Sequence, residues 1–72
     1  MLVYGNGNSL IFQSTSKIKS IEVYDTLGRM LFSNSNVDVK HFETSSVLKT
    51  NTVLLINITD ENQNTTKTKV IF

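Results

Sequence analysis

The amino-acid sequence predicts an all-β fold, a small antiparallel β-sandwich of about seven short strands. The 72 residues contain no alanine, Ser, Thr and Asn are abundant, and Val and Ile together outnumber Leu. Ser, Thr and Asn side chains compete with helical hydrogen bonds, and β-branched residues lose rotamer freedom in a helix. No segment keeps apolar residues at helical spacing for three turns, whereas short alternating apolar runs recur between turn sequences. These observations argue against a helical or mixed fold.

The chain is long enough for one domain, which we assign to residues 1–72. It has no cysteine, so no disulfide stabilises it, and the 39% of hydrophobic residues must form an ordinary apolar core. A domain of this size buries a smaller share of its surface on folding than a larger domain does, so we expect modest stability. The longest apolar run, Val53–Ile56, suits a strand rather than a membrane helix, and the start lacks the pattern of a signal peptide.

Turn sequences divide the first half of the chain into strands. Gly5–Asn8 has the composition of a tight turn, and Ser14–Lys17 is a polar break that should end a strand. The clearest local prediction is a hairpin over Ile21–Phe32. In it, two apolar runs flank the polar turn Asp25–Gly28, and Gly28 lies where the chain needs a positive φ.

Alternation within these runs predicts which side chains form the core. Ile21 and Val23 should point inward, and Met30 and Phe32 should share one face of their strand. The strand that follows is weaker, and its expected apolar anchors are Val37, Val39 and Phe42.

The second half contains the most apolar strand, Thr52–Asp60, and a terminal strand rich in Thr and Lys. The apolar residues of Thr52–Asp60 occupy both faces near its start, which is typical of a central strand. Ser45–Asn51 is long enough to carry the chain from one sheet to the other. The full set of expected strands is Leu2–Tyr4, Ser9–Ser14, Ile18–Tyr24, Arg29–Phe32, Val37–Thr44, Thr52–Asp60 and Thr65–Phe72, a spacing typical of an immunoglobulin-like sandwich.

Charge and composition argue against a nucleic-acid partner. The net charge is +1, and the seven basic residues are scattered rather than clustered. Lys67 and Lys69 lie two residues apart and share one face of the terminal strand, which by itself indicates a solvated strand face.

No catalytic, metal or cofactor residue is assigned, and we do not expect an enzyme. Gly5-x-Gly7 precedes a strand, whereas a phosphate-binding loop precedes a helix. His41 is the only histidine and has no partners at ligand spacing. The residues from Asp60 to Asn64 loosely resemble a calcium loop, but a polar hairpin turn explains them more simply.

Two segments resemble a known family. Lys19–Phe32 reads as a strand ending in Tyr-Asp, a short turn, Gly-Arg and an apolar strand, and Asn51–Thr59 is followed by the Thr/Lys strand Thr66–Phe72. In this order and spacing the chain resembles the C-terminal sorting domains of the type IX secretion system of Bacteroidetes. Asn51-Thr52-Val53 replaces the commoner Gly-(Val/Ile)-Tyr, which is similar to the variant called type C.

The resemblance implies a non-catalytic secretion signal that targets a larger, covalently linked N-terminal cargo across the outer membrane. Its partners would be the translocon shuttle and sortase-type outer-membrane proteins, with no nucleic acid and no small-molecule substrate. The domain would pass through the periplasm and end secreted or at the cell surface. An exposed terminal strand also offers backbone groups for strand addition by a partner. The recognition candidates are Gly28, Arg29, Lys67, Lys69, Val70, Ile71 and Phe72.

Two other functions remain open at this point. An accessory β-sandwich that binds carbohydrate or protein would present an exposed aromatic surface, yet the six aromatic residues are spread over several strands. A structural domain that pairs edge to edge with a second copy would form concentration-dependent dimers.

Overall fold

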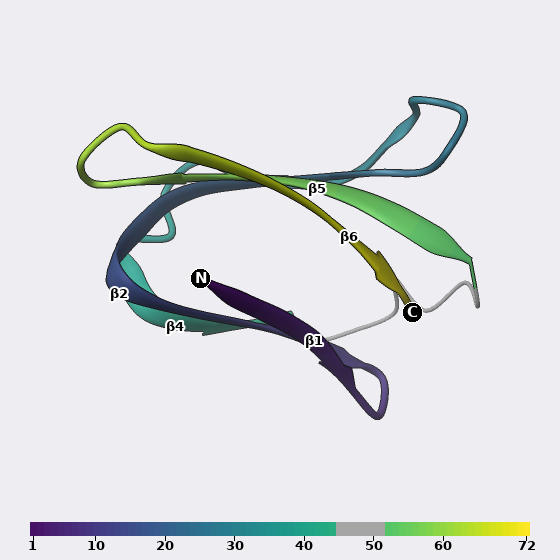
Figure 1. Cartoon of the computed structure of the whole chain (residues 1–72), viewed down its shortest axis with the longest axis horizontal. Helices are drawn as coiled ribbons and strands as arrows, with labels where there is room; N and C mark the ends of the chain where they lie inside the picture. The colour runs from purple at the N-terminus through teal and green to yellow at the C-terminus, as the bar shows by residue number, and fades with distance from the viewer. Residues whose placement is uncertain (45–51) are drawn as a thin grey trace.

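The strands belong to one antiparallel sheet that curls back on itself (Figure 1). The computed structural model describes residues 1–44 and 52–72, and the connection expected over residues 45–51 lies outside them. The six strands of the described residues are β1 Leu2–Asn6, β2 Ser9–Tyr24, β3 Met30–Asn34, β4 Val39–Glu43, β5 Val53–Asp60 and β6 Thr65–Ile71. The all-β, antiparallel prediction is therefore confirmed.

The strand β2 is the centre of the sheet because it belongs to both of its arms. Its first half pairs with β1 on one side and β4 on the other, and we call these strands the first arm. Its second half pairs with β3 and β5, and β5 pairs in turn with β6 to complete the second arm. Figure 1 shows β2 curving round one end of the molecule, with β5 and β6 across from β1 and β4.

The prediction that Ser14–Lys17 ends a strand is wrong, because the chain bends there without leaving the sheet. Between Gln13 and Ile18, β2 advances five positions while β4 advances only two, from His41 back to Val39. Such extra residues bend and twist a strand. The polar sequence thus marks an irregularity that lets one long strand serve both arms, where two strands were expected.

The turn between β5 and β6 holds this bend. The backbone N–H of Lys17 donates to Glu61 Oε2 at 2.7 Å, and the Glu61 N–H donates to the Lys17 carbonyl at 2.8 Å. Ser16 accepts a 3.4 Å hydrogen bond from the side-chain amide of Asn62. The two bonds with Glu61 satisfy the backbone N–H and C=O of Lys17, which has no partner in the strand ladders.

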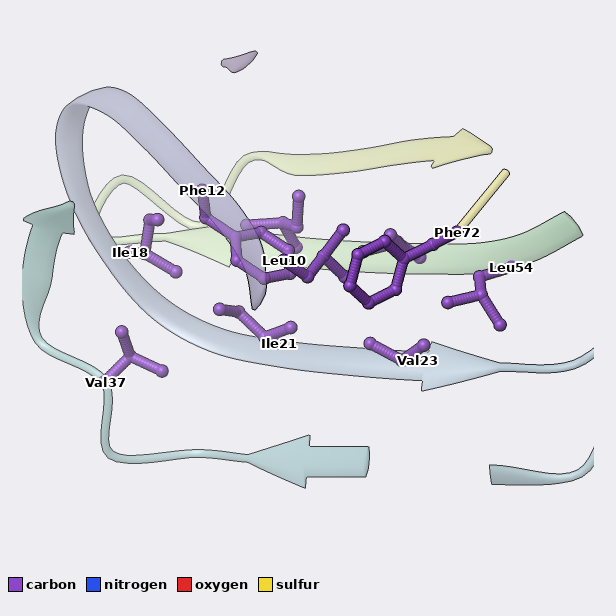
Figure 2. Close-up of a cluster of buried hydrophobic side chains, with 10 residues drawn as sticks. Leu10, Phe12, Ile18, Ile21, Val23, Val37, Leu54 and Phe72 are labelled. Carbon is purple, nitrogen blue, oxygen red and sulfur yellow. The ribbon is translucent and has the colours of Figure 1, made fainter. Parts of the chain in front are cut away.

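The core lies between the two arms. Figure 2 shows its side chains converging from β2, β5 and the chain end, with Phe72 in the same cluster as Leu10 and Leu54. Ile21 and Val23 are fully buried, as their alternation predicted. The buried members are Leu10, Phe12, Ile18, Ile21, Val23, Val37, Leu54, Ile56, Ile58 and Phe72.

Two side-chain predictions fail in the strands that follow the hairpin turn. Phe32 packs against the core, but a bulge opposite Val23 and Tyr24 shifts the register, and Met30 is exposed. Val39 is also exposed, whereas the other two expected anchors are confirmed: Val37, just before β4, is buried, and Phe42 packs against the core.

Gly5 allows Phe72 to close the core against β1. A Cβ built on Gly5 would lie 2.6 Å from Cδ1 of the Phe72 ring, closer than real Cβ contacts allow. The Phe72 N–H donates to the carbonyl of Thr52 at 3.1 Å, which fixes the backbone beside the ring. The chain end therefore packs between the arms only because position 5 carries no side chain.

We expect Gly5→Ala to lower the free energy of unfolding by about 1–3 kcal/mol, because the added methyl overlaps the Phe72 ring. Chemical denaturation measures the change. Repeating Gly5→Ala in a Phe72→Leu background should give a smaller loss, since the shorter side chain leaves room for the methyl. Equal losses in the two backgrounds would show that the Phe72 ring is not the obstacle.

Thr44 is the one buried polar residue of the described chain, and it ends the pairing of the first arm. Its hydroxyl accepts the Leu10 N–H at 3.0 Å, and its own N–H donates to the Leu10 carbonyl. Thr44→Val keeps the shape but leaves the Leu10 N–H without an acceptor. We expect a loss of about 1–3 kcal/mol in unfolding free energy. Thr44→Ser, which keeps the hydroxyl, should cost less, and the reverse order would contradict the assignment.

Candidate functional site

The face of the second arm that points away from the core carries a shallow groove. We call this face the outer face. The strand registers set Tyr24, Leu55 and Lys69 in one row across it, and Glu22, Asn57 and Lys67 in the next. The groove has a volume of about 340 Å³. It is lined by Tyr24, Gly28, Leu55, Ile56, Asn57, Lys67, Thr68 and Lys69.

The hairpin turn after β2 forms one wall of this outer groove. Asp25 Oδ1 accepts the N–H groups of Leu27 and Arg29, both at 2.9 Å, and the Gly28 N–H donates to the Asp25 carbonyl. Gly28 has a φ of +84°, so the predicted left-handed glycine is confirmed. The side chain of Leu27 at the tip of the turn is 79% exposed.

Asp25 also fixes the position of Arg29. Arg29 Nε lies 2.6 Å from Asp25 Oδ2, and the guanidinium side chain remains largely exposed. The Arg29 backbone N–H, with the Arg29 side chain and the Leu27 N–H, lowers the pKa of the Asp25 carboxyl below its ordinary value. The turn is therefore organised around an ionised carboxylate.

Alternation along β6 separates the recognition candidates into two groups. Lys67, Lys69 and Ile71 point to the outer face and are exposed, Ile71 at 77%. Val70 is half-buried and packs against the core, and Phe72 is buried within it. The structure thus brings Gly28, Lys67 and Lys69 together at one groove and places Val70 and Phe72 on the opposite face of the sheet.

The residues of the groove between the turn and the lysines were not among the recognition candidates expected from the sequence. Leu55 and Asn57 lie beneath the groove, and Tyr24 stands beside them. Desolvation at its half-buried position, and then the charge and hydrogen bond of the Glu22 carboxylate, raise the pKa of the Tyr24 hydroxyl. The available signal was the second apolar face of β5, which indicated a covered surface without saying what covers it.

The groove offers two ammonium groups at the rim of a mostly aliphatic and aromatic surface. Such a surface suits a ligand or partner with carboxylates beside apolar groups. Within residues 1–44 and 52–72, no group of three His, Cys, Asp or Glu side chains is placed to hold a metal ion. No helix of the same residues is long and apolar enough to cross a membrane.

Comparison with known proteins assigns a family from the whole sequence. The model of a family described as a domain of unknown function, DUF8694, matches residues 1–72. The chain belongs to this family. None of the curated proteins matches the chain. The DUF8694 assignment covers every strand of the sheet and both sides of the outer groove.

Because the pKa of Asp25 is lowered, the stability of the hairpin turn should depend on pH in the acidic range. A carboxyl whose folded pKa lies below its unfolded value stabilises the fold above the unfolded value, and this contribution disappears as the pH falls through the folded pKa. We therefore expect the turn to loosen below pH 3.8, the ordinary pKa from which Asp25 is lowered. Amide chemical shifts of Leu27 and Arg29, followed by NMR from pH 6 downward, should report a midpoint below 3.8.

Asp25→Asn should remove that titration from both amides. Asp38, whose pKa is also lowered through its contact with Lys19, provides the control. Asp38→Asn should leave the Leu27 and Arg29 profiles unchanged. A midpoint above the ordinary carboxyl value would contradict the arrangement of donors around Asp25.

Proposed function

We propose that this DUF8694 domain is a non-catalytic secretion signal, which directs a covalently linked N-terminal cargo through the type IX secretion system across the outer membrane. Its partners are the translocon shuttle and the sortase-type outer-membrane proteins. The domain passes through the periplasm and ends secreted or at the cell surface. The observation that carries the proposal is the meeting of Gly28 with Lys67 and Lys69 at one groove. These residues come from the two segments that resemble the sorting domains.

The character of the outer face supports this proposal. It combines two lysines with the exposed Ile71 and with Leu55, a pattern suited to protein recognition. Gly28 and Arg29 belong to a turn held by Asp25, so the recognition surface is preorganised. Val70 and Phe72 support it from the core side.

We propose further that the curled sheet is a compact form of the immunoglobulin-like sandwich, in which the two arms act as the two facing sheets. One strand, β2, then replaces the two short strands of the larger pattern. A solution structure in which the two arms do not face each other across the core would contradict this description.

An accessory module that binds carbohydrate is the competing proposal. Carbohydrate sites of this kind need aromatic rings on a common surface. Tyr4 lies on the first arm and Tyr24 on the second, and the rings of Phe32 and Phe42 pack against the core and each other. A glycan array with clear hits would favour the accessory module.

A reporter fusion tests the secretion proposal. Residues 1–72 joined to the C-terminus of a periplasmic reporter should send it outside a cell with a working type IX system. The double variant Lys67→Ser with Lys69→Ser should lower the extracellular reporter several-fold, because both charges leave the outer face. Retention of the unmodified fusion in the periplasm would contradict the proposal.

The matched control replaces two lysines away from the groove. Lys17→Ser with Lys40→Ser makes the same change in net charge, and both side chains are exposed. This variant should be exported like the unmodified fusion. Circular dichroism and thermal unfolding of all three domains establish that the variants remain folded.

A further inference from the structure

In the part of the chain that the structure describes, β6 is an edge strand with no strand paired along its second side. Among the described strands it pairs with β5 alone, through seven successive residue pairs with no shift of register. The other edge strands β1, β3 and β4 have five residues each, and the pairings of β3 and β4 with β2 contain irregularities. Short and irregular edges resist pairing with other chains, whereas a long regular edge invites it.

The hydrogen bonds at the two ends of the β5–β6 ladder show which backbone groups face outward. The Asp60 N–H donates to the Asn64 carbonyl, and the Phe72 N–H donates to the Thr52 carbonyl. In an antiparallel ladder, alternate residues exchange bonds with the partner strand, and the residues between them point the other way. The N–H and C=O groups of Thr65, Lys67 and Lys69 therefore point away from β5.

The same three residues send their side chains to the outer face. Lys67 and Lys69 are alternate residues of the strand. Each presents an ammonium group on the outer face and backbone N–H and C=O groups that point away from β5. A strand added to this edge would set one residue opposite each lysine, with side chains on the same face.

The charges of Lys67 and Lys69 determine which kind of strand can pair with this edge of β6. In the registers that overlap most, a second copy of this chain would place lysine opposite lysine, and like charges directly opposite are destabilising. Lysine on an edge is also a common device against self-association. An added strand with carboxylates at two alternate positions would instead pair with both lysines.

We propose that the edge of β6 from Thr65 to Lys69 binds an extended protein segment by antiparallel strand addition, and that this segment carries Asp or Glu opposite Lys67 and Lys69. The inference deepens the proposed function, on which it rests, by giving the chemistry of the partner segment.

A capped nine-residue peptide tests this inference without any secretion component. The peptide has Glu at its fourth and sixth positions and Thr or Val elsewhere. Added in excess to the isotopically labelled domain, it should slow amide hydrogen exchange at Lys67 and Lys69 several-fold. The amides of Thr66 and Thr68 already face β5, so their exchange should change little.

Charge reversal provides the matched comparison. Lys67→Glu with Lys69→Glu should weaken binding of the Glu peptide about tenfold and create binding of the same peptide with Lys at both positions. Lys40→Glu, on β4 of the first arm, should leave the affinity for the Glu peptide unchanged.

Three results would overturn the inference. The first is that the Glu and Lys peptides slow amide exchange equally. The second is that the Glu peptide changes chemical shifts without slowing exchange of the Lys67 and Lys69 amides. The third is that the Glu peptide does not bind at millimolar concentration. If the reporter fusion is exported while the peptide test fails, strand addition is wrong and the secretion proposal stands. If the peptide binds while the reporter stays in the periplasm, strand addition at β6 is confirmed and the secretion proposal is wrong.

Discussion

The bend in β2 is the constraint on which the rest of the structure depends. A single strand of 16 residues supplies the inner strand of the first arm and then of the second. Its curvature brings Leu10 and Phe12 over Ile21 and Val23, so this one strand supplies five of the ten buried residues of the core. Glu61 bonds to both backbone groups of Lys17 and couples the bend to the β5–β6 turn.

The two faces of β6 have different roles: the inward face contributes to the stability of the fold, and the outward face forms the proposed recognition surface. Thr68 and Val70 face inward, and Val70 packs on the core, while the lysines between and beside them face outward. A change at an inward position therefore alters folding, and a change at an outward position alters the surface. The lysines also protect a long edge in a chain that has no proline.

Sequence patterns anticipated the local structure well where a single chemical rule decides it. Gly28 has the positive φ that its place in the turn required, and the alternation before the turn correctly placed Ile21 and Val23 in the core. The patterns were less successful where contacts distant in the sequence decide. Ser14–Lys17 has the composition of a loop, and its bonds to Glu61 and Asn62, far away in the sequence, hold it within the sheet. The outer groove also depends on contacts between residues distant in the sequence, because Tyr24, Leu55 and Lys69 become neighbours only when β2, β5 and β6 pair.

The two hairpins at opposite ends of the second arm share one design. Asp60 Oδ1 accepts the N–H groups of Asn62 and Asn64, as Asp25 Oδ1 accepts those of Leu27 and Arg29. Gln63 has a φ of +63° at the position that Gly28 occupies in the other turn. Glycine adopts this conformation freely and glutamine at a cost, so the two turns differ in intrinsic preference despite their common geometry.

The packing of Phe72 against Gly5 has a consequence for the order in which the chain folds. During synthesis, the β1–β2 hairpin emerges early and forms from local contacts, but the core between the arms remains open until residue 72 is available. Pairings such as Tyr24 with Leu55 also require closure of a long intervening segment. Vectorial synthesis therefore delivers the last core side chain after all the others, and a nascent chain arrested before this point exposes the apolar surface that Phe72 later covers.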